Sequence, residues 1–411
     1  MKVLTDERLQ VTELDDWFAV GGGTGLRRAL AQPTTILEEL KAAELRGMGG
    51  AGFATHQKWA AVARAPAGRK WVLCNGNEDE PGTFKDRYLL ARTPHQVIEG
   101  ALIAAVATGS CQVVLYVNPR IPDALEILER AALQWAHGPL LRQVCDAVGR
   151  EVTLSVRASS GQYVGGEETG AIASVAGGFP FPRPKPPWPA ETGMCGEPTL
   201  VNNVETLALA CHVLWRGAAW FRGLGRTAPG TKLYSLSGDV VRPGLHELPL
   251  GTPLRELVFD HGGGMLAGRK LKAVFTGGPS NTLLTAGDLD VPLDFDSLRA
   301  RGFRLGTGAM IVVSEGTSIV RKTADYVSFF AESSCGQCPP CKVGTHQVAR
   351  ILRRIESNEG RPEDLEALDS FARLLPGSGR CGLVDGAATV LASSLRSFRA
   401  EYERALDKRS R

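Results

Sequence analysis

Four of the nine cysteines are spaced as ligands of a metal centre. Cys335, Cys338 and Cys341 form a C-x-x-C-x-x-C run, and Cys381 follows 40 residues after Cys341. Three closely spaced thiolates with a distant fourth are typical of a [4Fe-4S] site, whereas a structural zinc usually takes its ligands in two pairs. We therefore favour an iron–sulfur cluster over zinc, and either of them over four core cysteines.

A glycine-rich segment, RGMGGAGFATHQKW, occupies residues 46–59. Gly47, Gly49 and Gly52 match the letters of the dinucleotide fingerprint G-x-G-x-x-G, but that fingerprint follows a strand. Here the apolar periodicity of the preceding residues predicts a helix, so the usual Rossmann interpretation fails. The glycines instead allow the backbone to wrap closely around a ligand, and we expect Gly49 at positive φ. The alternative is a flexible or tightly packed glycine turn.

The helices on either side of this segment carry capping residues. Thr35 with Glu38 is the pattern of a capping box for the preceding helix. Thr55 is the expected N-cap of the following helix, and Lys58 falls in its first turn. Backbone N–H groups, the helix dipole and the ammonium can then converge on an anion. We therefore predict a phosphate-binding loop of unusual construction.

Acidic residues follow a predicted strand at residues 70–75. Glu78, Asp79 and Glu80 lie between Asn77 and a Pro-Gly pair. Ligands bind at the carboxyl ends of parallel strands, and three consecutive acids repel one another too strongly for ordinary packing. We interpret the cluster as a binding site, with a solvated turn as the alternative.

Two further segments combine polar side chains with restricted backbone. Glu167 and Glu168 occupy a second glycine-rich corner, YVGGEETG, at residues 163–170. Seven prolines occur in residues 177–198, too many for a helix or a central strand. In PRPKPPWP they place Lys185 and Trp188 on a stiff backbone, which can hold a cation and a stacking surface at fixed positions. The alternative is a linker.

The elements that must position these residues alternate between helix and strand. We predict helices at 95–108 and 123–136 and strands at 112–118 and 151–156, which indicates a parallel sheet with helical crossovers. Short strands separated by glycine and proline then predict a small α+β unit at residues 231–315. From residue 323 onward the pattern is helical.

The bulk composition excludes several classes of function. The 411 residues carry 47 Lys and Arg against 44 Asp and Glu, a net charge of +3 that gives no reason to expect nucleic acid as a partner. The length favours two to four domains. No apolar run is long enough to span a membrane, so we expect no direct membrane insertion. The odd, clustered cysteines favour a metal centre in a reducing, cytoplasmic compartment.

The motifs resemble those of a known family. RGMGGAGFATHQKW is similar to the flavin loop RGRGGAGFPTGxKW of the NADH-binding flavoprotein subunit of respiratory complex I, a family that also serves NAD-linked formate dehydrogenases and NAD-reducing hydrogenases. The resemblance extends over nearly the whole chain, because five further segments match family motifs: NGNEDEPGTFKDR, YVGGEETG, PRPKPPWP, VNNVET and SSCGQCPPCKVGT.

This resemblance implies FMN, NAD(H) and a [4Fe-4S] cluster as cofactors. It assigns FMN to the glycine loop, the first acidic cluster, the glycine-rich corner and the VNNVET motif. The residues implied are Gly47, Gly49, Gly50, Ala51, Gly52, Lys58, Asn75, Asn77, Glu78, Gly166, Glu167, Asn202, Asn203 and Thr206. Glu80 and Glu168 are implied beside the reacting rings. Asn77 replaces an aspartate of the family pattern, which keeps an acceptor but loses a charge.

For NAD(H), the resemblance implies that Lys185 contacts the nucleotide. Trp188 and Phe53 are implied to stack on opposite faces of adenine. Cys335, Cys338, Cys341 and Cys381 are implied as the cluster ligands. His56 departs from the family pattern, and its role is unassigned.

The resemblance also implies three domains and a function. We expect a Rossmann-like α/β domain for FMN and NAD(H) at 1–228, a ubiquitin-like β-grasp domain at 229–316 and a helical [4Fe-4S] domain at 317–411. The expected function is hydride transfer between NADH and FMN, followed by single-electron transfer to the cluster, within a multi-subunit oxidoreductase. The resemblance leaves open whether the complex oxidises NADH or reduces NAD. Expected partners are a thioredoxin-like [2Fe-2S] subunit, absent from this sequence, and a larger iron–sulfur or catalytic subunit. The alternative is a zinc-stabilised nucleotide-binding scaffold without redox turnover.

Overall fold

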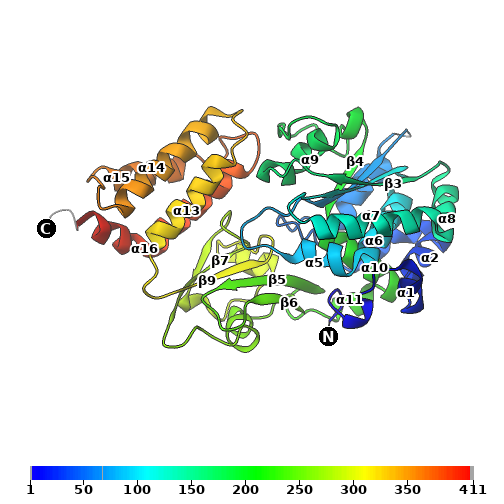
Figure 1. Ribbon diagram of the computed structural model, residues 1–411, viewed down its shortest axis with the longest axis horizontal. Coiled ribbons are helices and arrows are strands. Elements are labelled where there is room, and N and C mark those ends of the chain that lie inside the picture. Colours follow the sequence, from blue (N-terminus) through cyan, green and yellow to red (C-terminus); the bar gives the residue numbers. More distant parts are fainter. Residues whose placement is uncertain (1, 67, 408–411) are drawn as a thin grey trace.

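Two β-sheets and a separate group of C-terminal helices make up the computed structural model, which describes residues 2–66 and 68–407 (Figure 1). The first sheet takes its strands from residues 71–203, and the second from residues 231–314. The C-terminal helices, within residues 319–407, form an elongated group at one end of the molecule. The predicted α/β class with a helical C-terminal region is confirmed.

The first sheet is entirely parallel, with strand order β3-β2-β1-β4. Three of its strands were predicted to within two residues at each end, but β4 was missed because prolines precede it closely. Asn75 at the end of β1 pairs in register with Asn203 at the end of β4. The strands are β1 (Trp71–Gly76), β2 (Gln112–Val117), β3 (Thr153–Ala158) and β4 (Thr199–Asn203).

Helices cover both faces of this sheet (Figure 1). Helix α6 is almost completely buried and packs against α10, and α9 covers the opposite face through Ala171 and its neighbours. The helices of this part are α1 (Leu14–Ala19), α2 (Thr24–Ala31), α3 (Ile36–Ala42), α4 (Thr55–Arg64), α5 (Lys85–Arg92), α6 (Pro94–Thr108), α7 (Pro122–His137), α8 (Pro139–Val148), α9 (Glu168–Val175), α10 (Val204–Arg216) and α11 (Ala218–Arg222).

The second sheet has the strand order β6-β5-β9-β7-β8, with β5 and β9 parallel and the other pairs antiparallel. Counted within this sheet, the order is 2-1-5-3-4, which is the β-grasp arrangement expected from the family resemblance. Strands β6 and β8 were not predicted. The elements are β5 (Thr231–Gly238), β6 (Gly244–Pro249), a π-helix (Glu256–His261), β7 (Leu271–Thr276), β8 (Leu283–Thr285), α12 (Phe295–Ala300) and β9 (Ala309–Ser314).

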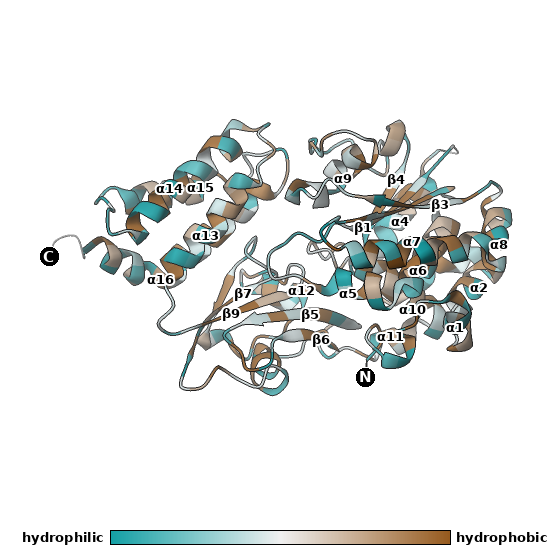
Figure 2. Cartoon of the chain, in the orientation of Figure 1, coloured by the Kyte–Doolittle hydropathy of each residue, from teal (hydrophilic) through white to brown (hydrophobic). Residues whose placement is uncertain are grey.

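The C-terminal helices pack around a core of their own that continues into β7 and β9. Hydrophilic residues mark the outer turns of α14 and α15, whereas β7 and β9 are largely hydrophobic (Figure 2). The helices are α13 (Ile319–Glu332), a π-helical turn (Pro340–Gly344), α14 (Thr345–Glu356), α15 (Asp364–Leu374) and α16 (Leu383–Asp407). Among the described residues, no helix is long and apolar enough to cross a bilayer.

Both capping predictions near the glycine loop are wrong. Thr35 makes no capping hydrogen bond to α3 and instead donates its hydroxyl to the carbonyl of Gln32. Helix α4 begins at Thr55 itself, so Ala54 is the N-cap residue. The Thr55 hydroxyl is buried and lacks a hydrogen-bond partner. The chain therefore enters both helices without the side-chain caps that the sequence suggested.

Candidate functional site

A cavity of about 1030 Å³ lies where the two sheets and the C-terminal helices meet. Pockets for small ligands and cofactors usually measure about 300–1,000 Å³, so this one is large. It collects residues from all three parts of the chain. The predicted site residues among its lining are Gly49, Gly50, Ala51, Asn75, Asn77, Glu78, Glu80, Gly166, Glu167, Asn203 and Cys381.

The glycine loop presents main chain to this cavity. Gly50 has φ +125° and Gly52 has φ +63°, conformations that side-chain-bearing residues rarely adopt. Gly49 does not have positive φ, so that prediction is wrong. It is nevertheless close-packed, because a Cβ there would lie 3.2 Å from Cβ of Asn203. At Gly52 a Cβ would lie 2.6 Å from the ring of Phe295.

The two glutamates of the acidic cluster have different surroundings. Glu78 accepts hydrogen bonds from the backbone N–H groups of Asp86 and Arg87 and from Nε of Arg87, so its carboxylate caps α5. Glu80 accepts hydrogen bonds from the hydroxyl of Tyr163 at 2.6 Å and the N–H of Ser280 at 2.9 Å. Burial raises the pKa of both carboxyls. Glu80 is therefore held between Tyr163 and Ser280 in the cavity lining. Glu78 instead fixes the start of α5.

Two asparagine side chains and Glu167 make hydrogen bonds that fix another part of the cavity lining. Asn75 donates to the carbonyl of Gly166 at 2.8 Å, and Asn77 donates to the carbonyl of Gln162 at 3.1 Å. The carboxylate of Glu167 caps α9, where it accepts hydrogen bonds from two backbone N–H groups. The carboxyl ends of β1 and β4 and the amino end of α9 thus meet at one cavity, as expected for ligand sites in parallel sheets.

The four cysteines predicted as metal ligands line one small pocket of about 10 Å³. Its other walls include Val164, Pro182 and Leu383. Val164, Cys381 and Leu383 also line the large cavity. The cysteine pocket and the cavity therefore share a wall.

The donor set of four thiols bears on which metal group the pocket would hold. A single zinc ion needs its ligands at about 2.0–2.3 Å from one point. A [4Fe-4S] cluster instead takes one thiolate at each of four irons, so its ligands surround a larger group. The donor set of four thiols around a small pocket fits the cluster.

Two family models match the regions that build these sites. The model described as "Nuo51 FMN-binding domain" matches residues 40–212, and that described as "NADH-ubiquinone oxidoreductase-F iron-sulfur binding region" matches residues 321–405. The NADH-quinone oxidoreductase F-subunit 2 of Rhizobium meliloti is 43% identical over 96% of this chain and 95% of its own length. The chain belongs to the NADH-quinone oxidoreductase F-subunit family.

Other members of the F-subunit family serve hydrogenases. NADP-reducing hydrogenase subunit HndC of Solidesulfovibrio fructosivorans is 36% identical over 96% of this chain and 81% of its own length. A crystal structure of an NAD+-reducing [NiFe]-hydrogenase in the H2-reduced state matches with a TM-score of 0.86 and 34% identity, over 97% of this chain and 67% of that one. The chain is thus an NADH-binding FMN and [4Fe-4S] subunit of a multi-subunit oxidoreductase.

The cavity has the features that FMN and a dinucleotide require of an F-subunit chain. The exposed backbone of Gly49 and Gly50 leaves space that a side chain would fill. Arg299 and Arg304 add cations to the lining, and guanidinium groups can bind phosphate oxygens in pairs. Neither arginine was predicted from the sequence, because no motif was recognised in the region around α12. Their role follows only from how the second sheet packs on the first.

Several predicted NAD(H) residues of this F-subunit chain lie outside the cavity lining. Glu168 accepts hydrogen bonds from Nζ of Lys58 at 2.7 Å and Nζ of Lys185 at 2.9 Å. Although burial opposes ionisation of Glu168, the two lysines lower its pKa. The ammonium of Lys185 lies 5.7 Å from the ring centroid of Trp188. Lys58, predicted for a phosphate, is therefore held by Glu168.

The exposure of two aromatic residues suits a stacking role. Phe53 is 55% exposed and Trp188 is 52% exposed. Large aromatic side chains are usually well buried, so two half-exposed rings are available to a planar ligand. Asn202 and Thr206 are instead buried: Asn202 accepts from Nε1 of Trp59, and Thr206 accepts from the N–H of Met48. These two residues support the glycine loop and the helix behind it.

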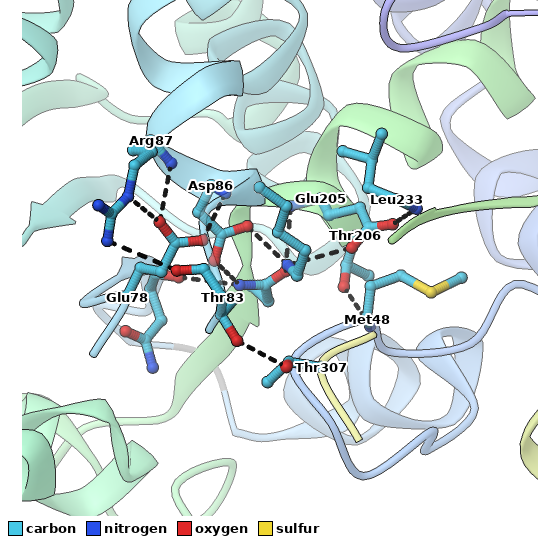
Figure 3. Close-up of polar contacts among 12 residues, drawn as sticks. Met48, Glu78, Thr83, Asp86, Arg87, Glu205, Thr206, Leu233 and Thr307 are labelled. Carbon is cyan, nitrogen blue, oxygen red and sulfur yellow. Dashed lines mark hydrogen bonds and ion pairs between the residues drawn. The ribbon is translucent and has the colours of Figure 1, made fainter. Parts of the chain in front are cut away.

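Four residues that the sequence did not single out form buried ion pairs at the cavity. Two of them, Asp86 and Glu205, are labelled in Figure 3. Lys85 and Asp86 begin α5, Glu205 lies in α10, and Lys232 lies in β5. All four are at most 5% exposed. The motif letters TFKDR and NNVET contain three of them. Lys232 comes from a strand without any motif, so its partners were not foreseeable.

Proposed function

We propose that this chain transfers a hydride between NADH and FMN in the large cavity and passes electrons singly to a [4Fe-4S] cluster in the cysteine pocket. The observation that carries this proposal is the shared wall of Val164, Cys381 and Leu383. One cluster ligand thus borders the flavin cavity directly. The three parts of the chain, 1–228, 229–316 and 317–411, then act as the nucleotide-binding, bridging and cluster-binding domains.

The glycine loop and the polar edge of the sheet hold the flavin in this proposal. Residues 47–53 offer main chain to the ribityl phosphate, and Asn75, Asn77 and Gly166 offer amides and main chain to the remaining polar groups. Bound FMN supplies the conversion of a two-electron hydride reaction into single-electron steps. Glu80 and Glu168 orient the reactants, and neither has to transfer a proton.

Lys185, Trp188 and Phe53 receive NAD(H). The two half-exposed rings stack on adenine, and Lys185 contacts the nucleotide where it already meets Glu168. These contacts position the dinucleotide so that its hydride-bearing carbon meets the flavin, the effect by which oriented binding lowers a barrier. Because hydride transfer is reversible, the same residues serve NADH oxidation and NAD+ reduction, and partner potentials set the direction.

The names of the relatives, which are subunits of larger oxidoreductases, support a role for this chain beside partner subunits. We propose a thioredoxin-like [2Fe-2S] subunit and a larger iron–sulfur or catalytic subunit, in the cytoplasm. A cluster held by the four cysteines would exchange electrons with these partners.

Cofactor analysis of the purified chain tests the proposal. After anaerobic reconstitution with iron and sulfide, we expect about one FMN, four irons and four sulfides per chain, with NADH-dependent reduction of an artificial acceptor. Zinc in place of iron, with no flavin and no acceptor reduction, would contradict the proposal and support the scaffold alternative.

A further inference from the structure

A buried cluster of charges links the second sheet to the flavin cavity. We call Lys85, Asp86, Glu205 and Lys232 the buried charge cluster. Nζ of Lys232 donates to Oε2 of Glu205 at 2.5 Å, and Nζ of Lys85 lies 3.0 Å from the same oxygen. Nζ of Lys85 also donates to Asp86 at 2.6 Å. Two cations and two anions thus share one buried site, and Lys85 and Asp86 also line the cavity.

Stability alone does not account for these charges. Removing four ionised groups from water has a large desolvation cost, and replacing buried ion pairs with apolar residues is often neutral or stabilising. The hydrogen bonds of the buried charge cluster have specific directions, however. Glu205 uses its other oxygen to accept from the N–H of Leu233 (Figure 3). Because Lys232 donates to the first oxygen, both ends of the carboxylate are tied to β5.

The buried charge cluster ends on Asn203, which lines the cavity. Oδ1 of Asn203 accepts from Nζ of Lys85 at 2.8 Å and from the N–H of Glu205 at 3.1 Å. Nδ2 donates to Asp86 at 2.7 Å and to the carbonyl of Asn75 at 3.4 Å. An amide side chain has two acceptor and two donor positions, and all four are used. Rotating this amide would place its NH2 against an ammonium.

Asn203 in turn braces the glycine loop. Its Cβ would lie 3.2 Å from a Cβ at Gly49, so the two segments are in close contact. A chain of direct contacts therefore runs from Lys232 through Glu205 and Lys85 to Asn203 and the loop. Lys232 itself is fully buried and does not line the cavity.

We propose that Lys232 is a positioning residue for the flavin cavity, acting through Glu205 and Lys85 to hold Asn203 against the glycine loop. The inference rests on the proposed function, because it takes the cavity as the FMN site. It gives the second sheet a role in cofactor binding: β5 supplies the buried cation that fixes the flavin-binding edge of the first sheet.

A lysine on the same sheet provides a matched control. Lys272 on β7 donates to Glu401 of α16 at 2.7 Å and to the carbonyl of Thr317. It also joins the second sheet to another part of the chain, but it lines neither the cavity nor the cysteine pocket. Loss of either lysine removes an ion pair between parts of the molecule. Only loss of Lys232 should change FMN binding.

The test compares Lys232→Met with Lys272→Met in the full-length, reconstituted protein. FMN affinity is measured by fluorescence titration, and flavin geometry by visible circular dichroism. Couplings through packed networks are typically about 0.5–2 kcal/mol, so Lys232→Met should weaken FMN binding about two- to thirty-fold and change the flavin dichroism. Lys272→Met should leave both readouts at wild-type values. Iron content should be unchanged in both variants.

Each result bears on the proposal. Equal FMN affinity and dichroism in Lys232→Met and wild type would overturn it, as would equal losses in both variants, which indicate a general stability effect. If Lys232→Met does not fold, Lys232→Gln, which removes the buried cation but leaves a polar side chain beside Glu205, takes its place, with wild-type affinity again counting against the proposal. A wild-type chain that binds no FMN would instead contradict the proposed function itself.

Discussion

The two cofactor sites of this chain are built in opposite ways. The cysteine pocket is small, and three of its four thiols come from one seven-residue run. The flavin cavity is large and takes its lining from both sheets and from the C-terminal helices. A cluster held by covalent bonds needs only correctly spaced ligands. A cofactor and a dinucleotide bound by many weak contacts need several elements in fixed relative positions.

This difference predicts that the two sites can be lost separately. The largest effect on the cavity should come from Gly50→Val, because Gly50 has φ +125° and lines the cavity. A β-branched residue resists that conformation and would project into the ligand space. We expect loss of FMN with iron content retained. Gly268→Val is the control, since Gly268 also has positive φ but has no heavy atom within 4 Å of its Cβ position. Full flavin content in Gly50→Val would show that the loop does not hold FMN.

The reverse separation is expected from Cys381→Ser. This change removes the one predicted cluster ligand that also lines the cavity, so the cluster should be lost or converted while FMN stays bound. Iron analysis and the electron paramagnetic resonance spectrum of the reduced protein measure the effect. Cys195→Ser, at an exposed cysteine far from the cluster motif in sequence, is the control. An unchanged spectrum in Cys381→Ser would rule out this ligand.

A smaller effect concerns the choice between NADH and NADPH. Glu168 binds Lys58 and Lys185, and removing its carboxylate frees two ammonium groups as well as removing an anion that repels a 2′-phosphate. Glu168→Ala should therefore favour NADPH by about 1–3 kcal/mol, a roughly five- to hundred-fold gain in relative kcat/KM. The assay compares both nucleotides at fixed salt. Glu403→Ala is the control, since Glu403 is an exposed glutamate of α16 that pairs with Arg399. A constant NADPH-to-NADH ratio would exclude Glu168 as the discriminating residue.

The smallest expected effect is on adenine stacking. Phe53→Ala and Trp188→Ala each remove one half-exposed ring, and aromatic pairs contribute about 0.5–1.5 kcal/mol beyond burial. We expect KM for NADH to rise about two- to tenfold in each variant, with FMN content unchanged. Leu374→Ala, at a residue that is 73% exposed, should have no effect. A wild-type KM in both aromatic variants would mean that adenine binds elsewhere.

The same difference explains how much the sequence could reveal. The cysteine run encodes its own geometry, because ligands three residues apart stay close in space whatever surrounds them. The alternating helices and strands of the first sheet were likewise predicted from local periodicity. Strand β4 was not, because five residues between prolines and a helix carry too little signal.

The cavity could be assembled from the sequence only through the family resemblance. Ser280, Asn281 and Thr307 line it from loops of the second sheet, yet no local pattern marks them. Lys58 was predicted for a phosphate, but its position on α4 brings it to Glu168. Such pairings depend on how separate elements pack, which neither spacing nor propensity specifies.

The shared wall between the two sites is the central claim, and rapid-freeze electron paramagnetic resonance after mixing with NADH tests it most directly. We predict that the reconstituted chain shows the reduced cluster signal within a single turnover. The flavin-free Gly50→Val protein, with its iron intact, should show none. Cluster reduction by NADH at the wild-type rate without flavin, or an oxidised cluster beside a fully reduced flavin, would contradict the account.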